Sequence, residues 1–139
     1  MKKNHCFRTL LVTALLLPIF GSQSVFAAET RKPAAIGALF YAESCGSCKV
    51  LDPKIVSAKE AMAEAPVLFV TFDHSTEATQ NQAALLADQL GLKEVYESQK
   101  KASGFFLLID PESGEILKTI TKSATVEEIK SDLQGAIQS

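Results

Sequence analysis

The sequence predicts an α/β fold in which a mixed sheet of four to five strands carries helices on both faces. The first observation is a set of three continuous apolar runs, which are typical of strands covered on both faces. The second is the helical spacing of apolar residues after each of the first two runs. The third is a turn signal after the last run, which predicts a hairpin. The expected element order is β-α-β-α-β-β-α.

The first half of the predicted fold consists of strands at residues 35–41 and 67–72 with a helix between them. Apolar residues recur at helical spacing over residues 50–62. Pro53 falls inside this helix and is expected to kink it or to mark its early turns, because proline lacks a backbone donor. Pro66 ends the segment. The two strands are expected to pair in parallel through a right-handed crossover.

The second half begins with a polar loop and a helix predicted at residues 83–90, with Gly91 at the C-terminal cap. A short turn follows around Tyr96. The third strand is predicted at residues 104–110, and a second β-α-β crossover is expected to make it parallel as well.

A hairpin and a last helix complete the prediction. The turn Pro111-Glu112-Ser113-Gly114 leads into a second arm at residues 115–121, which adds an antiparallel edge. Thr125 and Glu128 have the spacing of a capping box. A single apolar stripe then marks the final helix, and its members are Val126, Ile129, Leu133 and Ile137.

The composition is that of one globular domain. The chain has 139 residues, of which 47% are hydrophobic and 22% are charged. These values exclude a disordered chain and a multidomain enzyme, and three cysteines are too few for a disulfide-dense miniprotein. Acidic residues outnumber basic residues by 16 to 14, which excludes a strongly basic nucleic-acid-binding protein.

Residues 1–27 have the pattern of a cleaved secretory signal peptide, with cleavage expected after Ala27. Three basic residues precede an apolar run at residues 10–20. This run of about 11 residues is too short to cross a hydrocarbon core, which requires roughly 20. A cleaved signal is therefore favoured over a membrane anchor. A lipoprotein is disfavoured, because Cys6 precedes the apolar run.

Cleavage leaves an acidic domain at residues 28–139. It keeps 11 of the 14 basic residues and all 16 acidic residues, so its formal charge is −5. Such a domain has no electrostatic attraction to nucleic acid or to an anionic membrane surface. It loses Cys6 and keeps Cys45 and Cys48. A periplasmic or secreted destination is oxidising, so this remaining pair is able to form a disulfide.

Cys45 and Cys48 form a Cys-x-x-Cys pair, which occurs as a redox dithiol, as half of a zinc site or as a haem attachment site. Haem attachment requires a histidine after the second cysteine, where this chain has Lys49. A structural zinc site needs four ligands, and the domain has a single imidazole, that of His74. A purely structural disulfide adds little stability when it closes so short a loop. The redox interpretation is therefore favoured.

The position of the pair between a strand and a helix assigns different roles to its two sulfurs. The amides at a helix N-terminus stabilise a thiolate. Cys45 is expected at the exposed lip as the attacking thiolate, and Cys48 one turn inside as the resolving thiol. The expected cycle is thiolate attack on a substrate disulfide, a mixed disulfide, and release by Cys48.

Two segments carry a resemblance to a known family. Residues 40–49, FYAESCGSCK, followed by Pro53, resemble the active-site segment of the thioredoxin superfamily. Residues 104–117, GFFLLIDPESGEIL, resemble the late hairpin of secreted thioredoxin-like reductases. The resemblance covers about residues 34–138 and implies the thioredoxin fold and thiol–disulfide oxidoreductase chemistry.

Four positions depart from the family's usual pattern in the first part of the chain. Ser44 stands where the family usually has Trp, and Ser47 stands where thioredoxin has Pro and is expected to alter the reduction potential. Leu39 and Phe69 occupy the positions of thioredoxin's buried Asp and its partnering Lys. Loss of both charges together is physically coherent, because an unpaired buried charge costs several kcal/mol. It also removes the family's usual proton acceptor for Cys48.

Gly104 stands where the family places a cis-proline that faces the cysteine pair. Glycine is able to adopt an unusual backbone conformation there, and a plain loop-to-strand turn is the alternative. The resemblance also implies a substrate groove around the dithiol. Its expected residues are Tyr41, Ser44, Gly46, Ser47, Ser103, Gly104 and Phe105.

Two other groups are interpreted without a function. His74 follows the second predicted strand and is expected to be a solvated histidine. Asp110, Glu112 and Glu115 form an acidic turn, and a calcium loop requires more oxygen ligands at set spacing.

The leading hypothesis is a periplasmic or secreted thiol–disulfide oxidoreductase that acts on protein disulfides, most simply as a reductase. Its partners would be protein thiols or disulfides and a redox partner; it would act as a monomer, with no metal and no cofactor beyond the redox-active Cys45–Cys48 disulfide. The alternative is a module that binds or delivers Cu(I) or Zn(II) through the two thiolates, and Gly104 and His74 motivate it. A redox-inert, partner-binding thioredoxin fold is a third option. Reductases, oxidants and isomerases share these residues, because direction depends on potentials and electron donors.

Overall fold

The computed structural model describes residues 32–138, so the predicted signal peptide at residues 1–27 lies outside the described residues. The predicted order of elements is confirmed, with one more short helix, α3, where a turn was expected. The elements are β1 (Ala35–Tyr41), α1 (Gly46–Ala61), β2 (Val67–Asp73), α2 (Glu77–Gln89), α3 (Lys93–Gln99), β3 (Phe105–Ile109), β4 (Ile116–Thr121) and α4 (Val126–Gln138). Among these residues, no helix is both long and apolar enough to cross a membrane.

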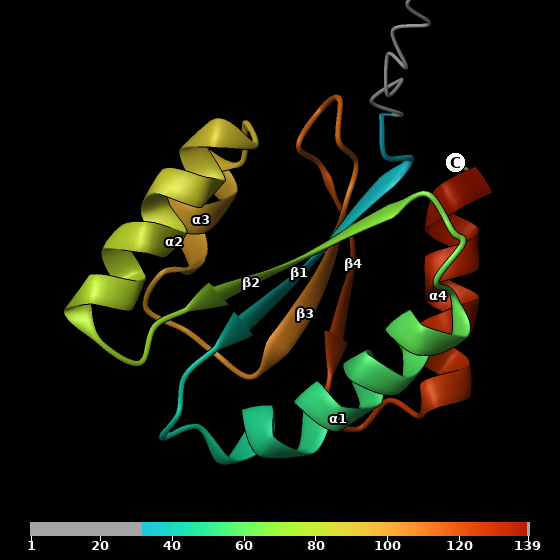
Figure 1. The fold of residues 1–139 in the computed structure, drawn as a ribbon, viewed down its shortest axis with the longest axis horizontal. Coiled ribbons are helices and arrows are strands. Elements are labelled where there is room, and N and C mark those ends of the chain that lie inside the picture. Colours follow the sequence, from blue (N-terminus) through green and yellow to red (C-terminus); the bar gives the residue numbers. More distant parts are fainter. Residues whose placement is uncertain (1–31, 139) are drawn as a thin grey trace, which may run out of the picture.

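The strands form one mixed four-stranded sheet in the order β2-β1-β3-β4. β1 pairs with β2 in parallel, with Ala35 opposite Val67 and Tyr41 opposite Asp73. β3 is antiparallel to both of its neighbours, β1 and β4. Figure 1 shows α2 and α3 on one side of this sheet and α1 and α4 on the other. The predicted α/β class, mixed sheet and helices on both faces are confirmed.

The direction predicted for the third strand is wrong, because β3 runs antiparallel to β1. The reason lies in α3. The chain leaves β2 at the end of the sheet where Tyr41 and Asp73 pair, and α2 leads away from that end. The turn at Gly91 and the helix α3 then bring the chain back to it. β3 begins there, since the Gly104 amide donates a hydrogen bond to the Phe40 carbonyl over 2.8 Å.

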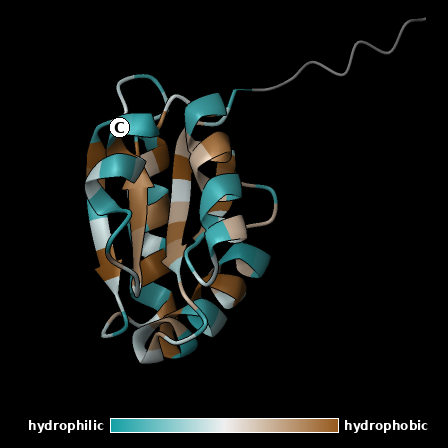
Figure 2. Ribbon diagram, turned by 90° about the vertical axis from the view of Figure 1, so that its left-hand side faces the viewer, coloured by the Kyte–Doolittle hydropathy of each residue, from teal (hydrophilic) through white to brown (hydrophobic). Residues whose placement is uncertain are grey.

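The sheet separates two apolar cores. In Figure 2 the strands inside the molecule are mainly hydrophobic, and hydrophilic residues predominate on the outer sides of the helices. Residues of β1 alternate between the cores, as strand geometry requires. Leu39 packs with α1 and α4, and Phe40 packs with α2 and α3. β1 is therefore held from both sides up to the point where it ends at Tyr41.

Side-chain capping by Thr76 and by Thr125 sets the starts of α2 and α4. α2 begins at Glu77, well before the predicted start at residue 83, because the side chain of Thr76 accepts the Thr79 amide over 3.1 Å and Thr79 Oγ1 accepts the Thr76 amide over 3.0 Å. α4 begins at the predicted capping box. Glu128 Oε2 accepts the Thr125 amide over 2.7 Å, and Thr125 Oγ1 accepts the Glu128 amide over 3.2 Å.

Gly37 in β1 is expected to resist substitution, because the ring of Phe106 lies directly over it. A Cβ at position 37 would overlap Cζ of Phe106, and Phe106 is fully buried. We expect Gly37→Ala to lower the free energy of unfolding by about 1–3 kcal/mol. Chemical denaturation measures this change.

The same substitution at Gly135 provides the matched control. Gly135 lies in α4 with nothing within 4 Å of a Cβ built there, so alanine should stabilise the helix by up to about 1 kcal/mol. Equal effects at the two positions would contradict the packing argument at Gly37.

Candidate active site

Cys45 lies at the N-cap of α1, just beyond the end of β1. Its amide donates to the Ala42 carbonyl over 3.0 Å, which turns the chain from the strand into the helix. Its Sγ accepts the Cys48 amide over 3.1 Å and so acts as the capping group. The two cysteines are unbridged, with Cys45 half-buried and Cys48 fully buried. The lip-and-interior arrangement predicted from the spacing is therefore present in the fold.

The thiol of Cys45 lies in surroundings that favour the thiolate. Burial by itself raises the pKa of Cys45, but hydrogen bonds outweigh it. They come from the Cys48 thiol, the Ser103 hydroxyl and the amides of Cys48 and Ser47. The net effect is a pKa below the ordinary cysteine value, which increases the thiolate fraction near neutral pH.

The thiol of Cys48 is displaced in the opposite direction. Burial raises the pKa of Cys48, and so do its hydrogen bond to Cys45 and the negative charge that develops there. Its Sγ donates to the Phe40 carbonyl over 3.8 Å. Weaker opposing effects come from the Ala42 backbone and the Ser103 hydroxyl. The pair therefore consists of an outer sulfur that ionises readily and an inner sulfur that retains its proton.

Gly104 lies directly against the dithiol. Its φ is +91°, and its amide donates to the Phe40 carbonyl over 2.8 Å. A Cβ at this position would lie 2.8 Å from Cβ of Ser47 and 3.1 Å from Sγ of Cys45. A plain turn does not require such an approach. A proline cannot occupy this position, because its φ is fixed near −65° and it has no amide hydrogen to donate.

The seven predicted groove residues divide into three groups. Ser47, Ser103 and Gly104 contact one another or the Cys45 sulfur. Ser44 and Gly46 are exposed at the rim. Tyr41 packs against the α1–α4 core, and Phe105 stacks on Phe40 in the other core, with ring centroids 4.9 Å apart. The fold thus brings three of the seven residues to the sulfurs, whereas Tyr41 and Phe105 pack into the two cores.

Leu39 occupies the position at which the resemblance places thioredoxin's buried Asp. Leu39 is only 3% exposed there, and Phe69 packs against the same core and stacks on Phe106 at 6.2 Å between centroids. The two apolar side chains fill the place of the family's charged pair, as predicted from their joint replacement. Any acid–base role for this position is absent in this chain.

His74 is not the solvated residue that was expected. Its ring lies edge-on against Phe40 and Tyr96, at 5.7 and 5.5 Å between centroids. Its Nε2 is buried and has no hydrogen-bond partner among residues 32–138. Burial lowers the pKa of His74, although Asp73 and a hydrogen bond to the Ala102 backbone oppose this. The sequence offered a signal, because His74 comes two residues after the buried Phe72, just beyond the end of β2.

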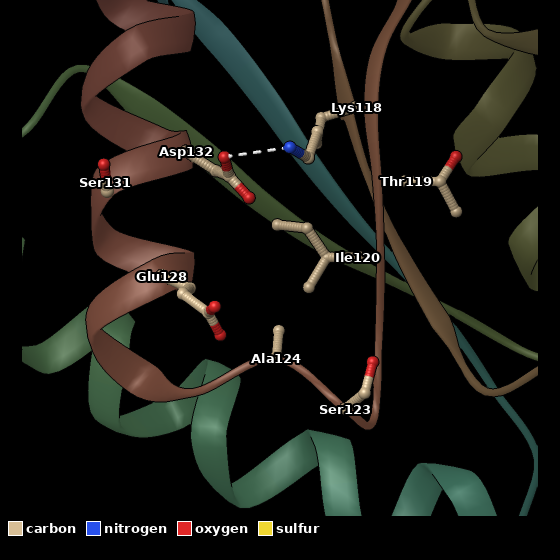
Figure 3. A pocket seen from close by; sticks show the side chains of 8 residues that line it. All are labelled: Lys118, Thr119, Ile120, Ser123, Ala124, Glu128, Ser131 and Asp132. Atoms are coloured by element: carbon tan, nitrogen blue, oxygen red, sulfur yellow. Dashed lines mark ion pairs between the residues drawn. The ribbon is translucent and has the colours of Figure 1, made fainter.

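Other polar clusters do not resemble a second site. Within residues 32–138, no group of three or more His, Cys, Asp or Glu side chains is arranged to hold a metal ion. A hollow of about 330 Å³ lies between β4 and α4, and Figure 3 shows Lys118 and Asp132 facing each other across it, 3.3 Å apart. Glu128 in the same hollow caps α4. The charged groups of this hollow are already engaged in structural contacts.

The contact between Gly104 and the dithiol predicts a large cost for any side chain at this position. Gly104→Ala adds a Cβ against Ser47 and Cys45 and also strains a positive φ, so we expect it to lower the free energy of unfolding by about 2–4 kcal/mol. Gly114→Ala is the matched control, because Gly114 also has a positive φ, of +72°, but nothing within 4 Å of its Cβ position. Urea denaturation should show the larger loss for Gly104→Ala; equal losses would rule out the crowding.

His74 predicts a pH dependence of stability. Because burial holds the pKa of the folded imidazole below the unfolded value of about 6.5, the folded protein binds fewer protons at this site than the unfolded chain. The stability associated with the neutral imidazole is fully present above about pH 6.5. The free energy of unfolding then falls as the pH decreases toward the lowered pKa of the folded state. His74→Asn should therefore flatten the decline of unfolding free energy between about pH 7.5 and pH 5. Urea titrations across this range measure both slopes, and identical slopes would refute the prediction.

Comparisons with known proteins agree with this geometry. The family model for thioredoxin matches residues 22–87. No curated protein sequence matches the chain. Among solved structures, the chain is similar to a thiol:disulfide interchange protein of the thioredoxin family from Chlorobium tepidum TLS, with a TM-score of 0.51 and 16% identity over 74% of this chain and 79% of that one.

Two further structures are similar at lower scores. StoA from Bacillus subtilis has a TM-score of 0.48 and 22% identity, over 76% of this chain and 85% of its own. Trxlp from Edwardsiella tarda EIB202 has a TM-score of 0.48 and 14% identity, over 81% and 94% of the two chains. The matched segment contains β1, the dithiol, α1 and β2, and the similarity to the Chlorobium tepidum structure shows that the chain has the thioredoxin fold.

Proposed function

We propose that the protein is a thiol–disulfide oxidoreductase that reduces protein disulfides outside the cytoplasm, with Cys45 as nucleophile and Cys48 as resolving thiol. The observation that carries this proposal is the geometry of the pair: half-buried Cys45 caps α1 with its Sγ, which accepts the Cys48 amide over 3.1 Å, and Cys48 is fully buried. In such a dithiol the outer sulfur is available to attack a disulfide, and the inner sulfur is available to resolve the mixed disulfide that forms.

The proposed cycle begins when the Cys45 thiolate attacks one sulfur of a substrate disulfide. The other substrate sulfur leaves as a thiolate and takes a proton from solvent. Cys48 then loses its proton and attacks Sγ of Cys45, which releases the second substrate thiol and forms the Cys45–Cys48 disulfide. Two electrons pass from the dithiol to the substrate. A reducing thiol partner must return two electrons and two protons to close the cycle.

The resolving step is favoured because two effects that raise the pKa of Cys48 depend on a free Cys45. In the resting protein the hydrogen bond to Cys45 and the charge on Cys45 both raise the pKa of Cys48. Both effects end when Cys45 is covalently bound to substrate, so the pKa of Cys48 should fall at the stage where its thiolate is needed.

The location and direction rest on the sequence. The signal-peptide pattern of residues 1–27 supports export. An exported acidic domain would meet proteins that contain disulfides, which are its proposed substrates. The resemblance of residues 104–117 to secreted reductases supports reduction. A Cys45–Cys48 potential near −270 mV fits a reductase, whereas a potential near −120 mV would make the protein an oxidant.

An insulin-reduction assay tests the proposed cycle. We expect the wild-type protein to catalyse insulin reduction when a small dithiol reagent supplies the electrons. Cys45→Ala should fall to the uncatalysed rate, because the nucleophile is lost. Cys48→Ser should instead retain the first step and accumulate a mixed disulfide with substrate, visible by mass spectrometry. Turnover by Cys45→Ala equal to that of the wild type would end the catalytic assignment.

A further inference from the structure

The turn at residues 42–45 leads the chain from β1 to the nucleophile. It is closed by the Cys45 amide, which donates to the Ala42 carbonyl over 3.0 Å, as in a β-turn. Its two middle residues, Glu43 and Ser44, are exposed. Because these residues do not pack into a core, the shape of the turn depends on its hydrogen bonds.

The hydroxyl of Ser75 reaches this turn from the segment that follows β2. Ser75 Oγ accepts the Glu43 amide over 2.9 Å and is also hydrogen-bonded to Oδ1 of Asp73. A hydroxyl has one proton to donate and two lone pairs that accept. Since the Glu43 amide is only able to donate, the hydroxyl proton is left for Asp73. The contact with Asp73 therefore orients a lone pair of Ser75 toward the turn.

The segment that carries Ser75 is itself fixed on both sides. Asp73 is the last residue of β2 and pairs with Tyr41 of β1. Oδ1 of Asp73 accepts the Ser75 amide over 2.8 Å, which is the hydrogen bond of an Asx turn. On the other side, Thr76 caps α2 by accepting the Thr79 amide over 3.1 Å. Ser75 is thus a fixed support between a strand end and a helix start.

The start of α2 does not account for the Ser75 hydroxyl. The capping residue of α2 is Thr76, whose own side chain accepts from the first turn of the helix. The Ser75 hydroxyl instead contacts Asp73 and Glu43, and Glu43 is 32 positions away in the chain. Its hydrogen bonds therefore join the end of β2 to the turn before the nucleophile.

The position of this turn determines where the nucleophilic sulfur lies. Sγ of Cys45 caps α1 by accepting the Cys48 amide over 3.1 Å, and an amide at a helix N-terminus stabilises a thiolate. The turn that leads to this sulfur is held at the Glu43 amide by Ser75. Loss of that hydrogen bond would allow the turn to shift and the sulfur to move away from the Cys48 amide.

We propose that Ser75 is a positioning residue for the nucleophile: its hydroxyl, oriented by Asp73, holds the turn at residues 42–45 so that Sγ of Cys45 stays on the Cys48 amide. This inference rests on the proposed function, since it concerns the same dithiol. It makes the reactivity of Cys45 depend on a side chain from the other strand end that does not itself contact the sulfur.

The test compares two substitutions of nearly equal shape, Ser75→Thr and Ser75→Val, which differ in the hydroxyl group. The readout is the pKa of Cys45, measured from the ultraviolet absorbance of its thiolate. Ser75→Thr keeps the hydroxyl and should retain the wild-type pKa. Ser75→Val loses the hydroxyl, so the pKa of Cys45 should rise and the rate of exchange with a small aromatic disulfide at neutral pH should fall by roughly twofold to fivefold.

A second variant separates positioning from a general loss of stability. Thr125→Val also replaces a hydroxyl by a methyl group, and it removes the contact of Thr125 Oγ1 with the Glu128 amide at the start of α4. It should lower the free energy of unfolding in urea, because a helix cap is lost. It should leave the pKa of Cys45 unchanged, because the turn at residues 42–45 keeps its hydrogen bond to Ser75.

The outcomes distinguish this inference from the proposed function. Equal Cys45 pKa values in Ser75→Thr and Ser75→Val would overturn the role of Ser75, and so would an equal rise in Thr125→Val. If Ser75→Val does not fold, Ser75→Ala takes its place against Ser75→Thr and is judged in the same way. Failure of the wild-type protein to reduce insulin would remove the proposed function, while the comparison of pKa values would still decide whether Ser75 positions the sulfur.

Discussion

The peptide group and side chain of Phe40 connect the dithiol to the rest of the fold. Its carbonyl accepts hydrogen bonds from the Gly104 amide and from the Cys48 thiol. Its ring lies at the centre of an aromatic cluster whose other members are Phe72, His74, Tyr96 and Phe105. One residue at the end of β1 therefore joins the inner sulfur, the start of β3 and the core under α2 and α3. The geometry of the site is set by core packing as much as by the loop that carries the cysteines.

The groups that lower the pKa of Cys45 are dipoles and not charged side chains. The described part of the chain has no buried charged side chain, and Leu39 and Phe69 stand where the family's ion pair would lie. What lowers the pKa of Cys45 is a set of amides and hydroxyl or thiol donors at short range. Such contacts act through orientation, and they are screened by salt much less than exposed ion pairs are.

The parts of the fold that sequence reasoning predicted are those with a local cause. β1 matches its predicted range because an apolar run covered on both faces has few alternatives, and α4 begins where Thr125 and Glu128 place the cap. The start of α2 was missed because residues 77–82 are mostly polar and carry no apolar period. The direction of β3 was missed because it depends on α3 returning the chain to the end of the sheet it had left.

The same distinction applies to the site. The spacing of Cys45 and Cys48 placed one sulfur at the lip and the other inside, since a helix start has only one such geometry. The approach of Gly104 to Ser47 and Cys45 and the burial of Nε2 of His74 depend on where distant loops meet, and no local pattern encodes that meeting. A histidine in alternation with Phe72 was the one available sign that its ring faces the core.

Two departures from the family pattern become a single feature in the folded protein. Ser47 and Gly104 stand at positions where thioredoxin has proline, and they are far apart in the sequence. In the structure a Cβ on Gly104 would lie 2.8 Å from Cβ of Ser47, so each position limits what the other accepts. Glycine at 104 admits the serine side chain at 47 and also supplies the amide that binds the Phe40 carbonyl, a bond that no proline makes. The loop facing the dithiol is thereby held by a hydrogen bond to the core, where the family relies on the shape of a ring.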